Sequence, residues 1–189
     1  MDHEKIKRGV RLILEGVGED PDREGLKDTP LRVADSYAEL CRGLLPGSCR
    51  PISTMESSNQ NELIIVKDIS FASLCEHHLL PFLGRCDVVY LPAGDRIAGL
   101  SSIVETVETM AARPTIQERL TTDIAERLMN ELKAKGVMVV MEAEHMCLAM
   151  RGVKKRDSRI VTSAMRGYLK KLETRTEALS LIGRSINSR

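Results

Sequence analysis

The chain has 189 residues, 42% of them hydrophobic, which is enough for one domain with a sizeable core that needs no disulfide for its stability. Its 28 Lys and Arg nearly balance its 27 Asp and Glu, which argues against a protein that binds nucleic acid through the phosphates. Because no apolar stretch approaches the roughly 20 residues that cross a bilayer, and the start of the chain lacks the apolar core of a signal peptide, we expect a soluble cytoplasmic protein without membrane partners.

The first part of the chain is predicted to be helical. Apolar residues recur at helical spacing over residues 6–17, which predicts a first helix. A second helix is expected within residues 28–45, where Thr29 can cap the helix and Pro30 suits its first turn. Residues 1–45 are therefore predicted to form an N-terminal helical segment.

A connecting loop and then a main domain are predicted next. Residues 46–61 are rich in Ser, Pro, Asn and Gly, a composition typical of loops. After them the apolar residues alternate with a period of two, which predicts β-strands. These strands are expected at residues 63–71, 85–92 and 137–153, with a hairpin across residues 92–100. The main domain is expected to span residues 62–189.

Helices are predicted between and after these strands. Helical patterns cover residues 101–112 and 115–136, separated by Pro114, and Gly136 is expected to end the second of them. A closing helix is expected at residues 174–186. Strands on both sides of a helical pair indicate an α+β domain in which one sheet is covered by helices.

Residues that commonly bind metals gather in two short segments. Three of the four histidines and two of the five cysteines lie at residues 75–78, with the sequence CEHH, and at residues 145–147, with the sequence HMC. An odd number of cysteines without regular spacing fits free thiols or metal ligands better than disulfides. Alternate side chains of a strand share a face, so His145, Cys147 and Arg151 are expected to project in one direction.

Two cysteine thiolates and one imidazole form a ligand set suited to zinc. The spacing leaves open whether His77, His78 or His145 would bind the metal. A catalytic zinc site keeps one position for water or substrate, and the free histidines could then transfer protons near neutral pH. The structural alternative is that Cys147 is a buried strand cysteine and that the adjacent histidines lie on the surface without a shared role.

Three segments carry a resemblance to a known family: CEHHLLPFLG, GLSSIVETVETMAARPTIQERLT and EAEHMCLAMRGV. In this order and at these separations they resemble GTP cyclohydrolase I, and the likeness runs from about residue 28 to residue 169. The resemblance implies a catalytic tunnelling-fold domain at residues 62–189, with an antiparallel sheet covered by helices, and a toroidal homodecamer with active sites at subunit interfaces. It also implies Zn²⁺ as the cofactor and the conversion of GTP to 7,8-dihydroneopterin triphosphate and formate, the first step of tetrahydrofolate biosynthesis.

The resemblance also implies roles for individual residues. Cys75, His78 and Cys147 would bind the zinc, and His77 and His145 would transfer protons. This agrees with the chemistry of ring opening, because carbon 8 of guanine becomes electrophilic once nitrogen 7 is protonated, and the steps that follow need further proton transfer.

Further residues match the family's contacts with the nucleoside. Glu118 would hold the guanine edge, whose ring amide and exocyclic amine both donate to a carboxylate, and Gln117 belongs to the guanine region. Without the resemblance, Glu118 would be interpreted as half of a capping box with Thr115. Ser101 would lie near the ribose, although its position also suits a helix cap.

Two arginines would bind the triphosphate. Arg151 and Arg32 stand where the family has phosphate-binding arginines, whose planar guanidinium groups bind phosphate oxygens in pairs. Either could instead be a simple exposed charge. The predicted strand favours Arg151, because this side chain would point toward the metal ligands.

The chain departs from the family at two positions. Where the family usually has a lysine and, three residues later, an arginine on the triphosphate, this chain has Ser102 and Glu105, which also have capping-box spacing. The change leaves an alternative, a relative with the same zinc chemistry that acts on a different purine nucleotide. A third hypothesis is a non-catalytic, zinc-stabilised assembly module, although such a module has no need for free histidines.

Overall fold

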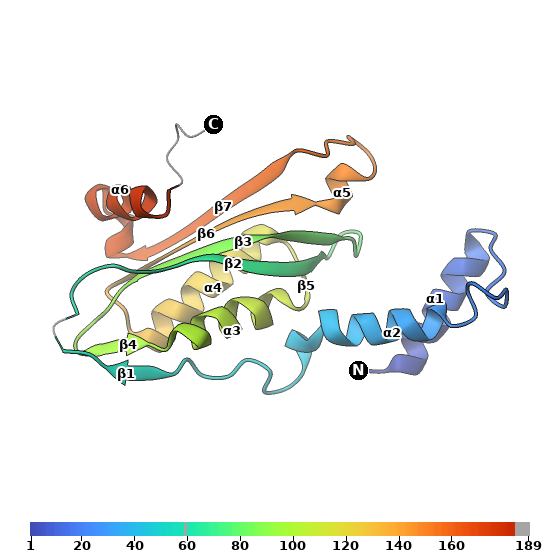
Figure 1. The fold of residues 1–189 in the computed structure, drawn as a ribbon, viewed down its shortest axis with the longest axis horizontal. Helices are drawn as coiled ribbons and strands as arrows, with labels where there is room; N and C mark the ends of the chain where they lie inside the picture. The colour runs from blue at the N-terminus through green and yellow to red at the C-terminus, as the bar shows by residue number, and fades with distance from the viewer. Residues whose placement is uncertain (59, 184–189) are drawn as a thin grey trace.

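The computed structural model describes residues 1–58 and 60–183, and a five-stranded sheet lies at its centre (Figure 1). The strands follow the spatial order β5-β2-β3-β6-β7. Their bounds are Ile64–Cys75 for β2, Pro81–Leu91 for β3, Pro114–Thr115 for β5, Gly136–His145 for β6 and Arg159–Gly167 for β7. Neighbouring strands are antiparallel, except that β2 and the short β5 are parallel. β7 has no counterpart among the predicted strands.

Helices cover both faces of this sheet (Figure 1). α3, Leu100–Ala111, and α4, Gln117–Leu132, pack against one face, and α6, Leu172–Leu181, lies against the other. Alternation along the strands builds two cores, since Val88 belongs to the cluster under α3 and α4 and Val89 to the cluster under α6. The predicted α+β architecture is therefore confirmed. The described part of the chain contains no helix that is long and apolar enough to span a membrane.

The N-terminal helices extend to one side of the sheet (Figure 1). α1, His3–Gly16, and α2, Thr29–Leu40, pack against each other, and a short 3-10 helix, η1, Arg42–Leu44, follows them. The predicted cap of the second helix is wrong, because Thr29 is already its first helical residue. The N-cap is Asp28, whose side chain makes no capping hydrogen bond.

A separate two-stranded sheet joins the connecting loop to the main domain. β1, Thr54–Glu56, lies within the predicted loop and pairs antiparallel with β4, Arg96–Ala98. The hairpin predicted across residues 92–100 is therefore wrong, because β4 pairs with the loop instead of folding back on β3. The hydroxyl of Tyr90 in β3 accepts a hydrogen bond from the N–H of Ala98 at 3.0 Å, which ties the two sheets together.

The predicted ends of two helices differ from the structure. α4 ends at Leu132 with Lys133 as its C-cap, in the left-handed conformation with φ 50°, and not at Gly136, which is the first residue of β6. A side chain at position 136 would meet Leu169 Cδ2 at 2.7 Å, so close packing explains the glycine. α6 overlaps the helix predicted at residues 174–186, of which residues 184–186 lie outside the described part of the chain.

The strand predicted to run through Arg151 ends early. β6 pairs along β3 until His145 faces Phe82, the second residue of β3, which runs antiparallel to β6. Beyond this point β6 has no partner to follow, and the chain turns into a short helix, α5, Met146–Ala149. The prediction that His145, Cys147 and Arg151 share one face of a strand is therefore wrong.

Candidate metal centre and active site

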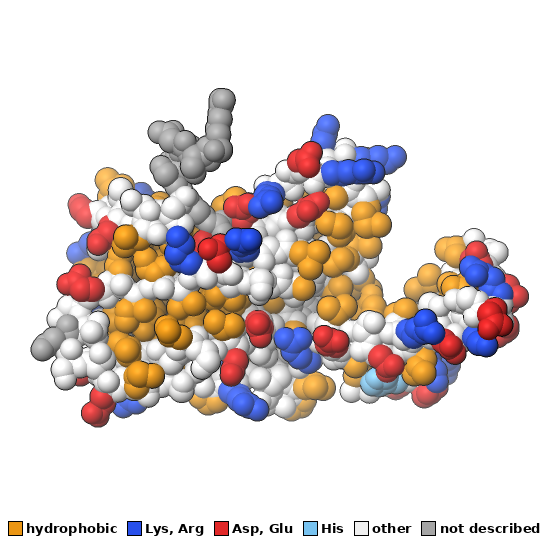
Figure 2. All heavy atoms as spheres, in the orientation of Figure 1, with side chains coloured by type: hydrophobic (Ala, Val, Ile, Leu, Met, Phe, Trp, Pro, Cys, Tyr) orange, Lys and Arg blue, Asp and Glu red, His pale blue; other side chains and the backbone are white. Residues whose placement is uncertain are grey.

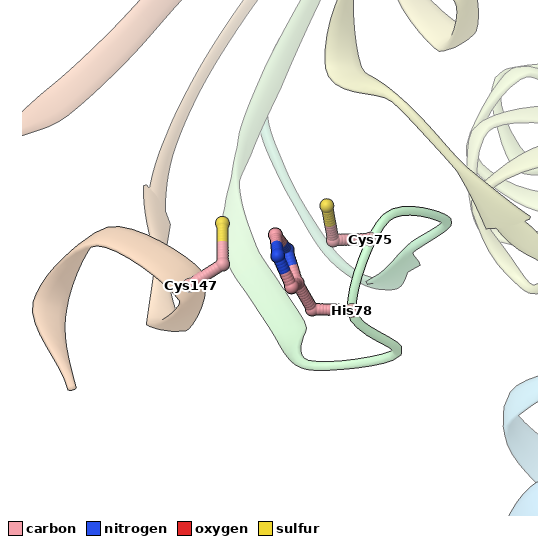
Figure 3. A group of neighbouring side chains, drawn as sticks. All are labelled: Cys75, His78 and Cys147. Atoms are coloured by element: carbon pink, nitrogen blue, oxygen red, sulfur yellow. The ribbon is translucent and has the colours of Figure 1, made fainter. Parts of the chain in front are cut away.

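Cys75, His78 and Cys147 form a compact group at one end of the sheet (Figure 3). The ligand atoms of the three side chains all lie within 4.8 Å of one another. Cys75 is the last residue of β2, His78 lies in the turn that leads to β3, and Cys147 lies in α5. Because β3 pairs with both β2 and β6, it brings these distant segments together. We call these three residues the metal-ligand group.

The turn between β2 and β3 places His78 beside Cys75. The N–H of Leu79 donates to the carbonyl of Cys75 at 2.7 Å, and Leu79 adopts φ 55°, in the left-handed region that side chains rarely occupy. Glu76 anchors the turn through a bidentate ion pair with Arg119 of α4, at 2.6 and 3.2 Å. The turn is therefore held both by its own strand and by a helix.

The donor set of the metal-ligand group fits zinc. Two sulfurs and one imidazole nitrogen are ligands that zinc commonly takes from proteins. Burial raises the pKa of the Cys147 thiol, and the nearby Cys75 raises it further, so the Cys147 thiol resists ionising without a cation beside it. A divalent cation at this position would reverse that effect by favouring both thiolates.

Arg151 lies beside the metal-ligand group, on the loop after α5. Its guanidinium contacts Nε2 of His78. Since a guanidinium can only donate, Nε2 of His78 is the acceptor in this contact. The charge of Arg151 also opposes the rise in the pKa of Cys147. An exposed cation is thus available at the edge of the group.

His145 lies next to the metal-ligand group in a half-buried position. Its ring stacks on that of Phe82, with centroids 4.7 Å apart and planes within 5°. Its Nε2 lies 2.8 Å from Oε1 of Gln117. Burial lowers the pKa of His145, and the carboxylate of Glu118 opposes this effect. An imidazole that stays neutral near pH 7 can accept a proton, as a general base must.

Gln117 is buried, with none of its surface exposed. Its Nε2 donates to the carbonyl of Met141 at 3.1 Å, to the carbonyl of Ile160 at 3.0 Å and to the hydroxyl of Thr162 at 3.0 Å. Both polar atoms of the side chain therefore have protein partners. These contacts differ from the guanine contact that the resemblance implies.

Glu118 and His77 are exposed, and both lie near the metal-ligand group. Glu118 lies in the first turn of α4, close enough to His145 to influence its pKa. The N-cap of α4 is Ile116, without a side-chain hydrogen bond, so the capping-box alternative for Glu118 is wrong. The ring of His77 lies 6.3 Å from that of His78, at an angle of 84°.

Ser101 lies at the opposite end of α3 from the metal-ligand group. The carboxyl end of α3 leads into β5, and β5 pairs with β2 at Cys75. At about 1.5 Å per residue, Ser101 lies about 15 Å along the helix from that end. Within one chain, Ser101 therefore lies far from the metal-ligand group.

The N-terminus of α3 is not capped as the alternatives predict. Its N-cap is Gly99, so neither Ser101 nor the Ser102–Glu105 pair caps this helix. Instead, Oγ of Ser102 accepts from the N–H of Ser53 at 3.1 Å and lies 2.5 Å from the Ser53 hydroxyl. Ser102 thus ties α3 to the connecting loop.

A pocket of about 470 Å³ lies between α3 and the connecting loop. Ser102 and Glu105 line it on one side, and Arg42 and Arg50 also line it. Two arginines from another segment therefore lie near Ser102 and Glu105, the positions where the resemblance implies two cations. Arg32, by contrast, is exposed on α2, with its guanidinium 3.4 Å from the carboxylate of Asp28.

Two contacts of His145 could not be predicted from the sequence. Phe82 lies within the segment CEHHLLPFLG, but nothing local marks it as the stacking partner of a histidine 63 positions later. The contact between His145 and Gln117 depends on how α4 packs on the sheet. To predict either contact one must know the strand register, which depends on residues far apart in the sequence.

The family model and the curated relatives that match this chain agree on one family. A family model described as GTP cyclohydrolase I matches residues 6–183. A protein of Carboxydothermus hydrogenoformans named GTP cyclohydrolase 1 is 50% identical over 184 residues, which cover 97% of this chain and 96% of that protein. One of Geobacillus sp. with the same name is 51% identical over 183 residues, covering 96% and 97%. Among solved structures, the apo form of the archaeosine synthase QueF-Like has a TM-score of 0.46 and 17% identity, covering 56% of this chain and 93% of that one.

Proposed function

The chain belongs to the GTP cyclohydrolase I family, and from that premise we propose that it opens the imidazole ring of GTP by hydrolysis, giving 7,8-dihydroneopterin triphosphate and formate. The reaction would take place in the cytoplasm, at the start of tetrahydrofolate biosynthesis. The observation that carries the proposal is the convergence of Cys75, His78 and Cys147 next to His145.

Cys75, His78 and Cys147 would hold Zn²⁺ and leave a position for water or substrate. Zinc bound there would act as a Lewis acid that activates water near neutral pH. The raised pKa of the Cys147 thiol supports this assignment, because a bound cation would stabilise the thiolate.

Glu118 would hold the guanine base. Its exposed carboxylate can accept from both donors on the guanine edge, the ring N–H and the exocyclic amine. Because Glu118 acts electrostatically on His145, a base held by Glu118 would lie close to His145. Carbon 8 of the purine could then be attacked at the metal-ligand group.

His145 and His77 would move the protons of the reaction. One imidazole would accept a proton as water attacks carbon 8, and a protonated imidazole would donate to the nitrogen that leaves when the carbon–nitrogen bond breaks. The half-buried position of His145 and the exposed position of His77 support separate tasks, since the two rings have different access to solvent.

The triphosphate would bind to Arg151 and to the loop that follows α5. Lys154, Lys155 and Arg156 are exposed on this loop, and Figure 2 shows Lys and Arg side chains gathered over the connection between α5 and β7. Charge-assisted hydrogen bonds from such cations suit phosphate oxygens. Arg32 would join the phosphate site from α2.

A second copy of the chain would complete the site. Ser101, which would contact the ribose, lies about 15 Å along α3 from the end near Cys75, so we infer that a neighbouring copy provides it. The two edges of the sheet also differ, because β7 forms one edge and most of β2 forms the other. Head-to-tail pairing of unlike surfaces generates rings. These features support a toroidal homo-oligomer, which we propose to be a decamer.

Nucleotide turnover tests the proposed function. Zinc-loaded protein is incubated in parallel with GTP, GDP, GMP and ATP, and formate and the fluorescence of the oxidised pterin product are measured. GTP alone is expected to give both products, and protein stripped of metal by a chelator serves as the inactive control. Formate release from another purine nucleotide in preference to GTP, or no release from protein that contains zinc, would contradict the proposal.

A further inference from the structure

The side-chain amide of Gln117 is enclosed by protein groups. Its Nε2 faces the carbonyl oxygens of Met141 and Ile160 and the hydroxyl of Thr162. Its Oε1 lies 2.8 Å from Nε2 of His145. Neither carbonyl can donate a hydrogen bond, so the amide nitrogen of Gln117 must be the atom that faces them.

The threonine hydroxyls support this orientation. The hydroxyl of Thr121 donates to the carbonyl of Gln117 at 2.7 Å. Thr162 Oγ1 lies 2.6 Å from Thr121 Oγ1, and since the hydrogen of Thr121 is already used, Thr162 is the donor in that pair. Thr162 is therefore left as an acceptor toward Gln117. A reversed amide would leave these buried and partly buried acceptors without the donor they have now, which native proteins rarely tolerate.

The orientation of Gln117 determines where His145 carries its hydrogen. Because Oε1 of Gln117 can only accept, Nε2 of His145 must donate and therefore carries a hydrogen. The ring cannot avoid this by turning over, because a ring rotated by half a turn would place a carbon where Nε2 now lies. Stacking on Phe82 holds its plane. Among residues 1–58 and 60–183, no group is hydrogen bonded to Nδ1 of His145.

We propose that Gln117 is a positioning residue that fixes His145 in the tautomer with its hydrogen on Nε2, leaving Nδ1 as the only ring nitrogen that exchanges a proton with substrate or water. The proposal rests on the proposed function, in which His145 transfers protons. It gives Gln117 a different task from the guanine contact that the resemblance implies. A partner that selects one tautomer keeps the same lone pair available in every turnover.

Steady-state kinetics separate the two tasks. Gln117→Met keeps the length and packing of the side chain but removes the acceptor for His145. We expect kcat to fall by about 10- to 100-fold while KM for GTP and zinc content stay close to those of the native protein. A rise in KM with native kcat would overturn the proposal in favour of a guanine contact. An unchanged kcat would also overturn it.

Tyr90→Phe is the matched control for losing a buried hydrogen bond. The hydroxyl of Tyr90 accepts from the N–H of Ala98 at the far end of β3 from His145. This variant is expected to lower the melting temperature and leave kcat unchanged. A fall in kcat of the same size as in Gln117→Met would show that any buried defect has this effect, and would overturn the proposal.

Nitrogen-15 NMR of zinc-loaded protein reads the tautomer directly and does not depend on a stable Gln117 variant or on turnover. The chain has four histidines, and comparison with His145→Ala assigns the signals of that ring. A protonated and a bare imidazole nitrogen differ widely in chemical shift, so the native protein is expected to show Nε2 protonated at His145. The opposite tautomer, or a mixture of both, would overturn the proposal. Absence of GTP turnover in the native protein would contradict the proposed function alone.

Discussion

Cys147 and His145 lie two residues apart but have different proposed roles. Cys147→Ser is expected to lose zinc, because it removes one of two thiolates from a three-residue ligand group. His145→Ala is expected to keep zinc and to lose turnover by about 100- to 10,000-fold, the range for a general acid or base. Metal analysis and formate release measure the two effects. Zinc retained in Cys147→Ser would remove Cys147 from the ligand group.

Arg151 is expected to act on the triphosphate. Arg151→Ala should raise KM for GTP by about tenfold or more and affect kcat less, because a charge-assisted hydrogen bond contributes about 1.5–3 kcal/mol. Arg159→Ala is the control, since it removes the same charge from an exposed arginine paired with Glu142. Zinc content is measured in both variants, because Arg151 contacts His78. Equal effects of the two substitutions on KM would contradict a specific role.

The metal-ligand group could be predicted from the sequence, while its surroundings could not. The residue types in the two segments indicate a metal but leave the choice of histidine open. The family resemblance selects His78, and the structure brings Cys75, His78 and Cys147 together. The stacking of Phe82 on His145 and the burial of Gln117 depend on strand register and helix packing. No local pattern contains that information.

At the scale of the elements, the close approach of β3 and β6 determines where the site residues meet. A Cβ at Gly84 would lie 2.0 Å from the carbonyl oxygen of Glu142 and 2.6 Å from Cβ of Ala143, both in β6. Since these neighbours are mainly backbone and strand core, they cannot move without disturbing the register that places His145 opposite Phe82.

Gly84→Ala is therefore expected to lower the free energy of unfolding by about 1–3 kcal/mol, the usual cost of overpacking. Gly9→Ala is the control, because Gly9 lies within α1 and an added methyl group there would have nothing within 4 Å, so this change should add about 0.5–1 kcal/mol. Chemical denaturation measures both. A Gly84→Ala protein as stable as the native one would contradict the tight packing of β3 against β6.

The elements that local patterns describe well are the long ones. The helices and the central strands have clear apolar periods, and the structure contains them. The sequence around β4 predicts a hairpin, but β4 pairs with β1, whose residues lie 40 to 44 positions earlier in the chain. Short strands without a strong pattern receive their partners from the rest of the fold. β6 ends at His145 because β3, which runs antiparallel to it, begins at Pro81, so the boundary of β6 is also set by another segment.

At the scale of the whole molecule, the proposed active site needs two copies of the chain. A decamer of 21.0 kDa chains would have a mass of about 210 kDa, which light scattering measures. His145→Ala and Ser101→Trp proteins are each expected to be inactive. In a random equal mixture, about a quarter of the sites would combine a native His145 with a native Ser101 from the neighbour. Co-assembly should therefore restore about a quarter of native activity, and no recovery would contradict a shared site.

X-ray absorption at the zinc edge tests the metal site most directly. Protein loaded with one zinc per chain is expected to show two sulfur neighbours at about 2.3 Å and two nitrogen or oxygen neighbours at about 2.0–2.1 Å, one of the latter from water. Addition of a substrate analogue should change the light-atom shell and leave both sulfurs in place. A fourth ligand from the protein, fewer than two sulfurs, or no stable binding of zinc would contradict a hydrolytic centre built on Cys75, His78 and Cys147.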